Sequence, residues 1–187
     1  LNTKGLNFKK YGVHSLLSLS PFLQFVSLLL MRNFLNDHGP LNGLLQTLHL
    51  TNGPIPFLTD PLWAKFSIIF VNMWIGIPFT MLVATGIIMN LPTEQIEAAE
   101  IDGASKFQIF KSITFPQILL IMAPSLIQQF IGNINNFNVI YFLTGGGPTN
   151  SEYYQAGSTD LLVTWLYKLT VSAKDYNLAS VIGILIF

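Results

Sequence analysis

Residues 90–116, NLPTEQIEAAEIDGASKFQIFKSITFP, form a charged segment between two long apolar runs. Thr93 is expected to cap a helix whose first turn is acidic. Acidic side chains in the first turn interact favourably with the positive end of the helix dipole. Gly103 predicts the end of that helix and a sharp turn. A second short helix is expected over residues 105–112, and Pro116 marks the entry into the next apolar run. The segment therefore predicts two short helices joined by a glycine turn.

Three long runs without a charged side chain surround this segment, at residues 11–31, 66–93 and 112–151. They hold 21, 28 and 40 residues, and about 20 apolar residues suffice to cross a bilayer. A fourth run begins near Asn177 and continues to Phe187. Buried helices of a soluble protein would need a very large core elsewhere in the chain. The runs therefore predict an all-α membrane protein, a polytopic transmembrane helix bundle.

Composition supports this class and excludes others. The chain is 51% hydrophobic and 10% charged, whereas soluble domains carry about 25% charged residues. Nine basic and nine acidic residues cancel, so no basic field indicates a nucleic-acid partner. The absence of cysteine excludes disulfides and thiolate metal sites. The three histidines are scattered, and no metal or cofactor is expected.

The chain begins at Leu1 and ends inside an apolar run, so we expect a single domain over residues 1–187 that is truncated at both ends. The segments 1–13 and 90–115 are separated by two predicted spans, so they must lie on the same side of the membrane. Together they carry five of the basic residues, and the other four lie elsewhere. The positive-inside rule weakly favours the cytoplasm for the first group.

The segments between the runs are rich in turn residues. Residues 36–60 contain several proline and glycine turn signals, and the stretch from Leu41 to Leu50 is expected to form a helix at the surface. Residues 144–158 open with Thr-Gly-Gly-Gly-Pro and predict a loop. Residues 159–170 predict an amphipathic helix, with Ser158 or Thr159 as its cap.

The residue order within 97–116 resembles the signature of binding-protein-dependent ABC importer permeases. That signature is Glu-Ala-Ala, three residues, Gly, nine residues, then Ile-x-Leu-Pro. The chain has Glu97-Ala98-Ala99, then Gly103, then Ile113-Thr114-Phe115-Pro116 at the same spacing. Phe115 replaces the usual leucine, which is a mild apolar change.

The resemblance implies a role for this segment. In that family it lies in the cytoplasm as a coupling helix that seats in a cleft of a separate ATPase subunit. Residues 93–112 would be the coupling helices, and ATP hydrolysis would occur on another chain, because no phosphate-binding loop is present here. The residues implied in coupling are Glu97, Ala98, Ala99, Gly103, Ile113 and Pro116.

The third run carries several amide side chains, among them Gln129, Asn133 and Asn136. On one continuous helix these three would lie within an arc of about 60°. A polar stripe of this kind has two equally good interpretations. Its amides could form hydrogen bonds between helices, each contributing about 0.6 kcal/mol, or they could line a path for a polar solute. Neutral amides without a neighbouring Arg or Lys favour an uncharged, hydroxyl-rich solute.

The second and third runs resemble the larger membrane subunit of maltose/maltodextrin importers. The similarity rests on residues 71–79 (VNMWIGIPF), 135–148 and 156–163, and it covers nearly the whole chain but only the central part of that family's chain. The sugar contacts implied by the resemblance fall on Ile75, Gly76, Phe79, Gln129, Gly132, Asn133 and Asn136. Gln129 stands where a serine is usual and Gly132 where an aromatic is usual, which puts sugar stacking at that position in doubt.

We therefore expect a non-enzymatic permease subunit that imports maltose or maltodextrin by alternating access, multi-pass in the inner (plasma) membrane. The implied partners are a second permease subunit, two ATP-binding subunits, an extracytoplasmic solute-binding protein facing the Gly145–Pro148 loop, the lipid bilayer and a maltodextrin-like sugar. One alternative is the same family with another oligosaccharide or glycerol phosphate. A second is a membrane-embedded enzyme, which would need ionisable side chains that the second and third runs lack.

Overall fold

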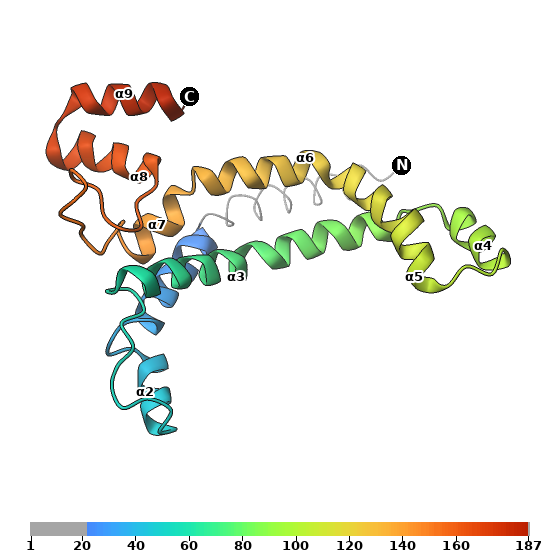
Figure 1. The fold of residues 1–187 in the computed structure, drawn as a ribbon, viewed down its shortest axis with the longest axis horizontal. Coiled ribbons are helices and arrows are strands. Elements are labelled where there is room, and N and C mark those ends of the chain that lie inside the picture. The colour runs from blue at the N-terminus through green and yellow to red at the C-terminus, as the bar shows by residue number, and fades with distance from the viewer. Residues whose placement is uncertain (1–21, 187) are drawn as a thin grey trace, which may run out of the picture. The chain divides into compact units, whose positions relative to one another are not determined.

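The computed structural model describes residues 22–186, in which the regular structure is helical (Figure 1). The chain divides into two compact units. The first unit joins Leu1–Asn72 to Asn135–Phe187, and the second is Met73–Ile134.

Of the predicted span over residues 11–31, the part up to residue 21 lies outside the described residues. The remainder belongs to a helix over Phe22–Phe34. The fourth apolar run forms α9, Tyr176–Ile186.

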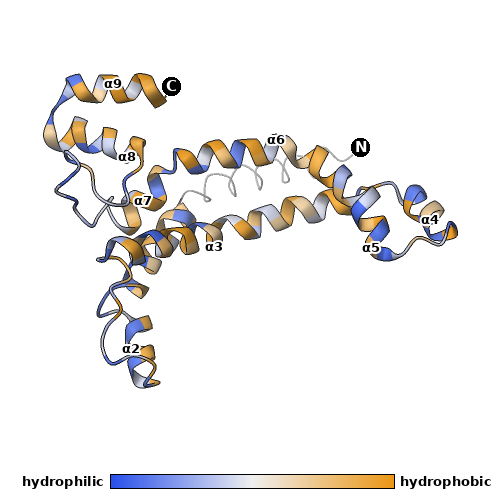
Figure 2. Cartoon of the chain, in the orientation of Figure 1, coloured by the Kyte–Doolittle hydropathy of each residue, from blue (hydrophilic) through white to orange (hydrophobic). Residues whose placement is uncertain are grey.

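The second apolar run forms α3, Pro61–Ile88, as predicted. Asp60 caps this helix, because its Oδ1 accepts hydrogen bonds from the backbone N–H groups of Leu62 and Trp63 at 2.9 and 3.0 Å. Pro61 takes the first helical position, where no N–H is needed. Only 11% of the most apolar 18-residue stretch of α3 is buried within the chain. Its hydrophobic surface (Figure 2) therefore requires lipid or further helices to cover it.

A second helix of membrane length runs over Lys106–Ile134. It consists of α5 (Lys106–Ile109), a π-helical turn (Phe110–Thr114) and α6 (Phe115–Ile134). The short helix predicted over residues 105–112 is present, but it continues into the membrane-length helix without a break. Pro116 lies in the first turn of α6, directly after the π-helical turn. Proline has no backbone N–H to donate to a carbonyl group of the preceding turn. This missing hydrogen bond is consistent with the π-helical pattern of residues 110–114.

α4 spans Thr93–Ile101 between these two long helices. The predicted capping by Thr93 is wrong by one position, because Pro92 is the cap residue and Thr93 is already helical. The fixed φ of Pro92 and its extended ψ make it the last non-helical residue. The predicted turn at Gly103 is confirmed, since this residue has φ +77° and follows Asp102, the C-cap of α4.

The third run is not one helix, and the prediction of a continuous polar stripe along it is wrong beyond Ile134. α6 ends there, and α7 (Phe137–Leu143) begins after a break at Asn135. The Oδ1 of Asn136 caps α7 by accepting a hydrogen bond from the backbone N–H of Val139 at 3.2 Å. Asparagine side chains compete with helical hydrogen bonding in this way. Gln129 and Asn133 still share α6, whereas Asn136 belongs to the other unit.

The remaining helices belong to the first unit. α2 spans Pro40–Thr47, in agreement with the predicted surface helix. α8 spans Leu162–Tyr167 and is followed by a second π-helical segment. A small apolar core of Leu169, Ala179 and Ile182 packs this segment against α9. The predicted cap at Ser158 or Thr159 is wrong: Leu161 precedes the helix, because the Thr159 hydroxyl is bonded to the 144–148 loop instead.

Candidate functional site

The turn between α4 and α5 is held by local hydrogen bonds. The backbone N–H groups of Asp102, Gly103 and Ala104 donate to carbonyl groups in the last turn of α4. Ser105 then opens α5 with a capping box: its N–H and its hydroxyl donate to the Oε1 of Gln108 at 2.8 and 2.9 Å. The turn is therefore closed at both ends by its own residues.

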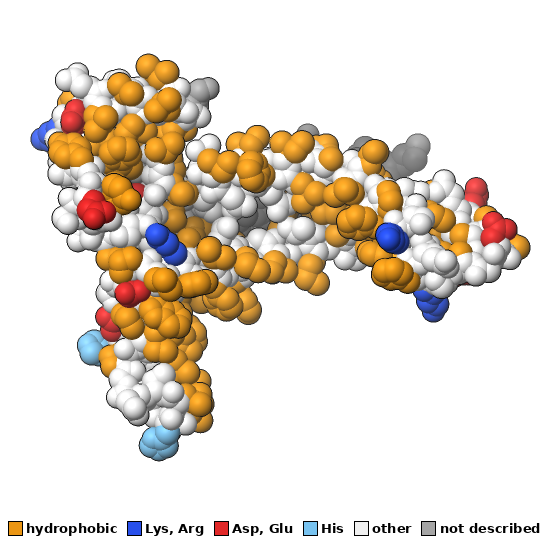
Figure 3. Space-filling view, in the orientation of Figure 1, with side chains coloured by type: hydrophobic (Ala, Val, Ile, Leu, Met, Phe, Trp, Pro, Cys, Tyr) orange, Lys and Arg blue, Asp and Glu red, His pale blue; other side chains and the backbone are white. Residues whose placement is uncertain are grey.

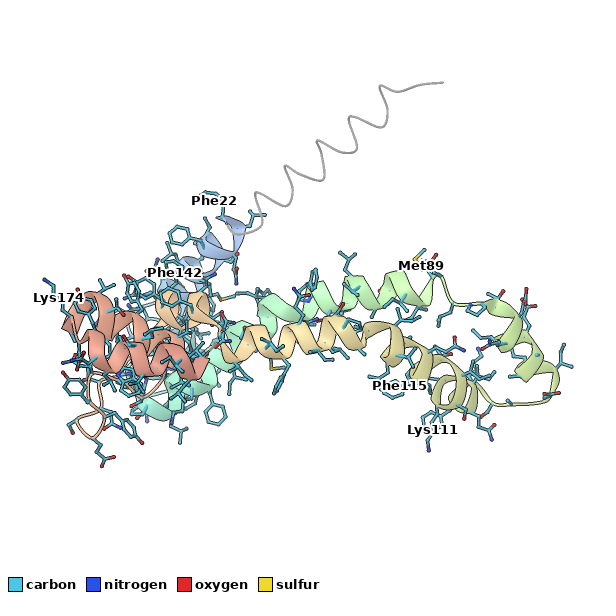
Figure 4. The ribbon with its side chains drawn as sticks, turned by 90° about the horizontal axis from the view of Figure 1, so that it is seen from above. Phe22, Met89, Lys111, Phe115, Phe142 and Lys174 are labelled. Carbon is cyan, nitrogen blue, oxygen red and sulfur yellow. The ribbon has the colours of Figure 1, made fainter. Side chains whose placement is uncertain are left out.

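A cleft of about 400 Å³ lies in the angle between α4 and the helix that follows. Of the predicted coupling residues, Ala99, Gly103 and Ile113 line it. Glu97 and Ala98 lie on the exposed side of α4, outside the lining. Pro116, in the first turn of α6, is also exposed and outside the lining. Figure 4 shows Met89 at the end of α3 and Lys111 on the segment that leads into α6, with the turn extending beyond both.

α4 carries an acidic surface. Glu94, Glu97 and Glu100 recur at a spacing of three residues, all three are exposed, and α4 contains no basic residue. Within residues 22–186 none of the three forms an ion pair. These carboxylates therefore form an exposed acidic surface on α4.

The polar positions of the second unit meet at Thr80. Its hydroxyl contacts the carbonyl oxygen of Gly76 on its own helix and the Oε1 of Gln129 on α6, both at 3.0 Å. The Nε2 of Gln129 is buried and has no hydrogen-bond partner among the described residues. Thr80 was not among the predicted contacts, although its position one turn after Gly76 was a usable signal.

The other predicted sugar contacts of this unit are distributed differently. Ile75 is half-buried, while Phe79, Gly132 and Asn133 are exposed. A Cβ added at Gly132 would meet no atom within 4 Å, so the glycine leaves open space beside α6. The structure thus joins Gly76 to Gln129 through Thr80, and it does not gather all the predicted residues at one point.

Asn136, the predicted contact in the first unit, is engaged at both ends of its amide. Its Nδ2 donates to the Oδ1 of Asn72 on α3 at 2.9 Å, while its Oδ1 caps α7. Asn72 is a second residue that the sequence analysis did not assign to a site. The pair joins the break before α7 to α3.

The Gly145–Pro148 loop rests on a buried ion pair. The Nζ of Lys168 lies 2.6 Å from the Oδ2 of Asp160, whose side chain is only 2% exposed. A Cβ on Gly146 would collide with the Asp160 carboxylate, and Gly146 also has φ +80°. The backbone N–H of Gly157 donates to the same carboxylate, at 2.6 Å. The loop is therefore a fixed structure, as its hydrogen bonds to Thr159 also indicate.

A cluster of aromatic side chains joins α7 to α8. Phe137, Tyr141 and Tyr167 lie with ring centroids 5.0–5.3 Å apart. A side-chain hydrogen bond with Tyr141 raises the pKa of Tyr167 above its ordinary value. Tyr153 and Tyr154 are exposed, and the latter's carbonyl oxygen accepts a hydrogen bond from the Trp165 indole at 2.8 Å.

Comparisons with known proteins agree with these features. The profile of the family "Binding-protein-dependent transport system inner membrane component" matches residues 11–187. The galactooligosaccharides transport system permease protein GanP of Bacillus subtilis (strain 168) is 39% identical over 100% of this chain and 44% of its own length. The maltodextrin transport system permease protein MalC of Streptococcus pneumoniae serotype 4 is 39% identical over 87% of this chain and 39% of its own length.

A solved structure has the same fold. It is a bacterial alginate ABC transporter in complex with an alginate pentasaccharide-bound periplasmic protein, matched with a TM-score of 0.67 and 26% identity over 87% of this chain and 54% of that one. The chain spans less than half the length of the two permeases above. The fold is the all-α helical membrane fold of ABC importer permeases, and the chain belongs to the family of binding-protein-dependent transport system inner membrane components.

Proposed function

We propose that this chain is part of the membrane-spanning permease subunit of an ATP-driven carbohydrate importer, and that the imported sugar is maltose or a maltodextrin. The observation that carries the proposal is the turn between α4 and α5, which connects two helices of membrane length and keeps Glu97 exposed. The subunit would move the sugar by alternating access, without making or breaking bonds in it.

Residues 93–112 would couple this motion to ATP hydrolysis on a separate chain. The acidic face of α4 suits a basic cleft on an ATPase subunit. α5 continues into α6 as one helix over Lys106–Ile134, so a displacement of the turn is transmitted along that helix rather than absorbed by a loop. Coupling would therefore depend on Glu97, Ala98, Ala99, Gly103, Ile113 and Pro116.

The sugar path would use the amides and small residues of α3 and α6. When the path opens, a sugar hydroxyl would be a suitable acceptor for the Nε2 of Gln129, which has no partner among the described residues. Thr80 contacts the Oε1 of the same side chain. The proposed sugar contacts are Ile75, Gly76, Phe79, Gln129, Gly132, Asn133 and Asn136. No charged side chain lies in residues 66–93 or 112–151, which favours a neutral sugar over glycerol phosphate.

Another oligosaccharide is the alternative substrate, because GanP and MalC are equally similar to the chain at 39% identity. The assembly would contain a second permease subunit, two ATP-binding subunits and an extracytoplasmic solute-binding protein near the Gly145–Pro148 loop. It would lie in the inner (plasma) membrane, with residues 93–112 in the cytoplasm.

The coupling assignment is tested with Gly103→Trp in the full-length complex reconstituted in liposomes. The left-handed φ of Gly103 strains any side chain in the native turn, and an indole there would fill the cleft that lies beside it. We expect ATP-dependent sugar uptake to be lost while the subunit still inserts and assembles. Gly103→Asn is the matched control, because asparagine tolerates a left-handed conformation, and it should retain most uptake. Normal uptake by the Gly103→Trp variant would exclude the coupling role.

A further inference from the structure

α2 presents a row of exposed leucines although it lies in a connecting segment. Its apolar side chains are Leu41, Leu44, Leu45 and, at its end, Leu48. On a helix these four lie within an arc of about 100°. Leu44 and Leu48 are each 58% exposed, so the described residues of the first unit leave this face uncovered.

The orientation of α2 is fixed by Asn42, whose side chain is buried at 1% exposure. Its Nδ2 donates to the carbonyl oxygens of Asn36 and Ile55 at 3.2 and 2.9 Å, and its Oδ1 accepts from the Ile55 N–H at 2.8 Å. Gly39, before the helix, packs against backbone carbonyls that a Cβ would strike. The leucines are therefore held outward by an element that cannot easily rotate.

The apolar surface of α2 continues onto the start of α3. A groove of about 240 Å³ connects them, lined mainly by Leu35, Leu41, Phe57, Trp63, Phe66 and Phe70. Trp63 lies in the first turn of α3, and Phe66 and Phe70 are each 60% exposed. Tryptophan at the end of a membrane-length helix is typical of the membrane–water interface.

The direction of α2 agrees with such a position. Figure 1 shows that α2 runs across the direction in which α3 leaves its first turn. In Figure 3 hydrophobic side chains gather on the edge of the α2 lobe that faces this direction, and histidine lies on other edges of the lobe. If α3 crosses a bilayer, α2 lies in the plane of the membrane surface with its leucines toward the lipid.

We propose that α2 and this groove form an interfacial anchor that rests in the boundary between the headgroups and acyl chains of phospholipid. Amphipathic helices occupy this layer at a depth of about 5–10 Å. The proposal rests on the proposed function only in taking α3 as a membrane span. Because α2 precedes α3 and α4 follows it, the anchor would sit in the leaflet opposite the coupling turn, where it fixes the depth of the outer end of α3.

Site-directed spin labelling of the full-length complex in phospholipid liposomes tests the anchor, since residues 1–187 contain no cysteine that would take up label. Labels are placed one at a time at Leu44→Cys and Leu48→Cys, with Gln46→Cys on the opposite face as the matched control. Accessibility is measured to oxygen, which partitions into lipid, and to a water-soluble nickel chelate. We expect the two leucine positions to favour oxygen at least threefold relative to Gln46.

Two results would overturn the anchor. Labels at Leu44 and Leu48 that are as open to the nickel chelate as Gln46 would place α2 in water. Labels shielded from both reagents would mean that another protein segment covers the leucines. A further label at Ile69→Cys, on the exposed surface of α3, keeps the two proposals separable. If the label at Ile69 is also accessible to the nickel chelate, α3 does not span the membrane and both proposals fail. If only the labels on α2 are accessible to it, the anchor alone is contradicted.

Discussion

Two glycines in functional loops are required for different physical reasons. Gly103 has φ +77°, and a Cβ there would meet no atom within 4 Å, so its constraint is conformational. Gly146 has φ +80°, and in addition its Cβ would overlap the Asp160 carboxylate and the Lys168 ammonium. The first residue therefore permits a turn, while the second also permits close packing against a buried ion pair.

This difference predicts unequal effects of alanine. Gly103→Ala should cost about 1–2 kcal/mol, the penalty of a left-handed conformation. Gly146→Ala should cost more, because a buried ion pair that is separated loses about 3 kcal/mol or more. The measurement is the thermal unfolding midpoint of the detergent-solubilised full-length complex, with limited proteolysis at residues 149–157 as a local probe. Equal midpoints, with no added cleavage in Gly146→Ala, would contradict the packing argument.

At the scale of the element, long uncharged runs and glycine turns were sufficient to predict most helices. The sequence predicted α3, the α2 surface helix and the turn at Gly103, because apolar length and turn chemistry are local properties. It did not predict the break at Asn135, since a constant 100° per residue assumes that the helix continues. The capping bonds of Asn136 and the hydroxyl bonds of Thr159 depend on contacts made elsewhere in the fold.

The candidate sugar site shows the same limit. Resemblance assigned Gly76 and Gln129 independently, but the hydrogen bonds of Thr80 that join them are tertiary. Similarly, Asn72 acquires a role only through its 2.9 Å contact with Asn136. Residue types and their spacing predict which side chains lie close together along one helix. Contacts between α3 and α6 depend on how the two helices pack, which the spacing along either one does not give.

Adjacent glutamines on α6 provide a matched test of the proposed sugar path. Gln129→Leu removes the buried Nε2 donor and leaves Thr80 bonded to Gly76. Loss of one hydrogen bond of this kind costs about 1 kcal/mol, or roughly a fivefold higher KM for sugar uptake. Gln128→Leu, an exposed position one residue earlier, should leave KM unchanged. Similar KM values for both variants would remove Gln129 from the path.

For the whole molecule, the described residues form helices whose apolar surfaces are left largely uncovered. Each of the two membrane-length helices has only 11% of its apolar stretch buried, and the chain spans less than half of the permeases it resembles. The remaining surface is therefore available to lipid and to further helices of the importer. In the proposed function, substrate choice would depend on the few polar groups that these helices carry, such as Thr80 and Gln129.

Those polar groups predict a preference for neutral sugars. Transferring an unpaired carboxylate into a path without a cation costs several kcal/mol, and no Arg or Lys lies in residues 66–93 or 112–151. In the full-length complex with its binding protein, labelled maltodextrins should therefore enter at least about tenfold faster than uronate oligosaccharides of equal length. Uptake of galactooligosaccharides, measured in the same panel, shows which of the two neutral sugars, maltodextrin or galactooligosaccharide, the importer prefers. Binding of each sugar to the solute-binding protein alone is the control, because it removes selection that occurs before the membrane. Uronates that enter as fast as maltodextrins, at equal occupancy of the binding protein, would show that charge is compensated by residues outside these helices.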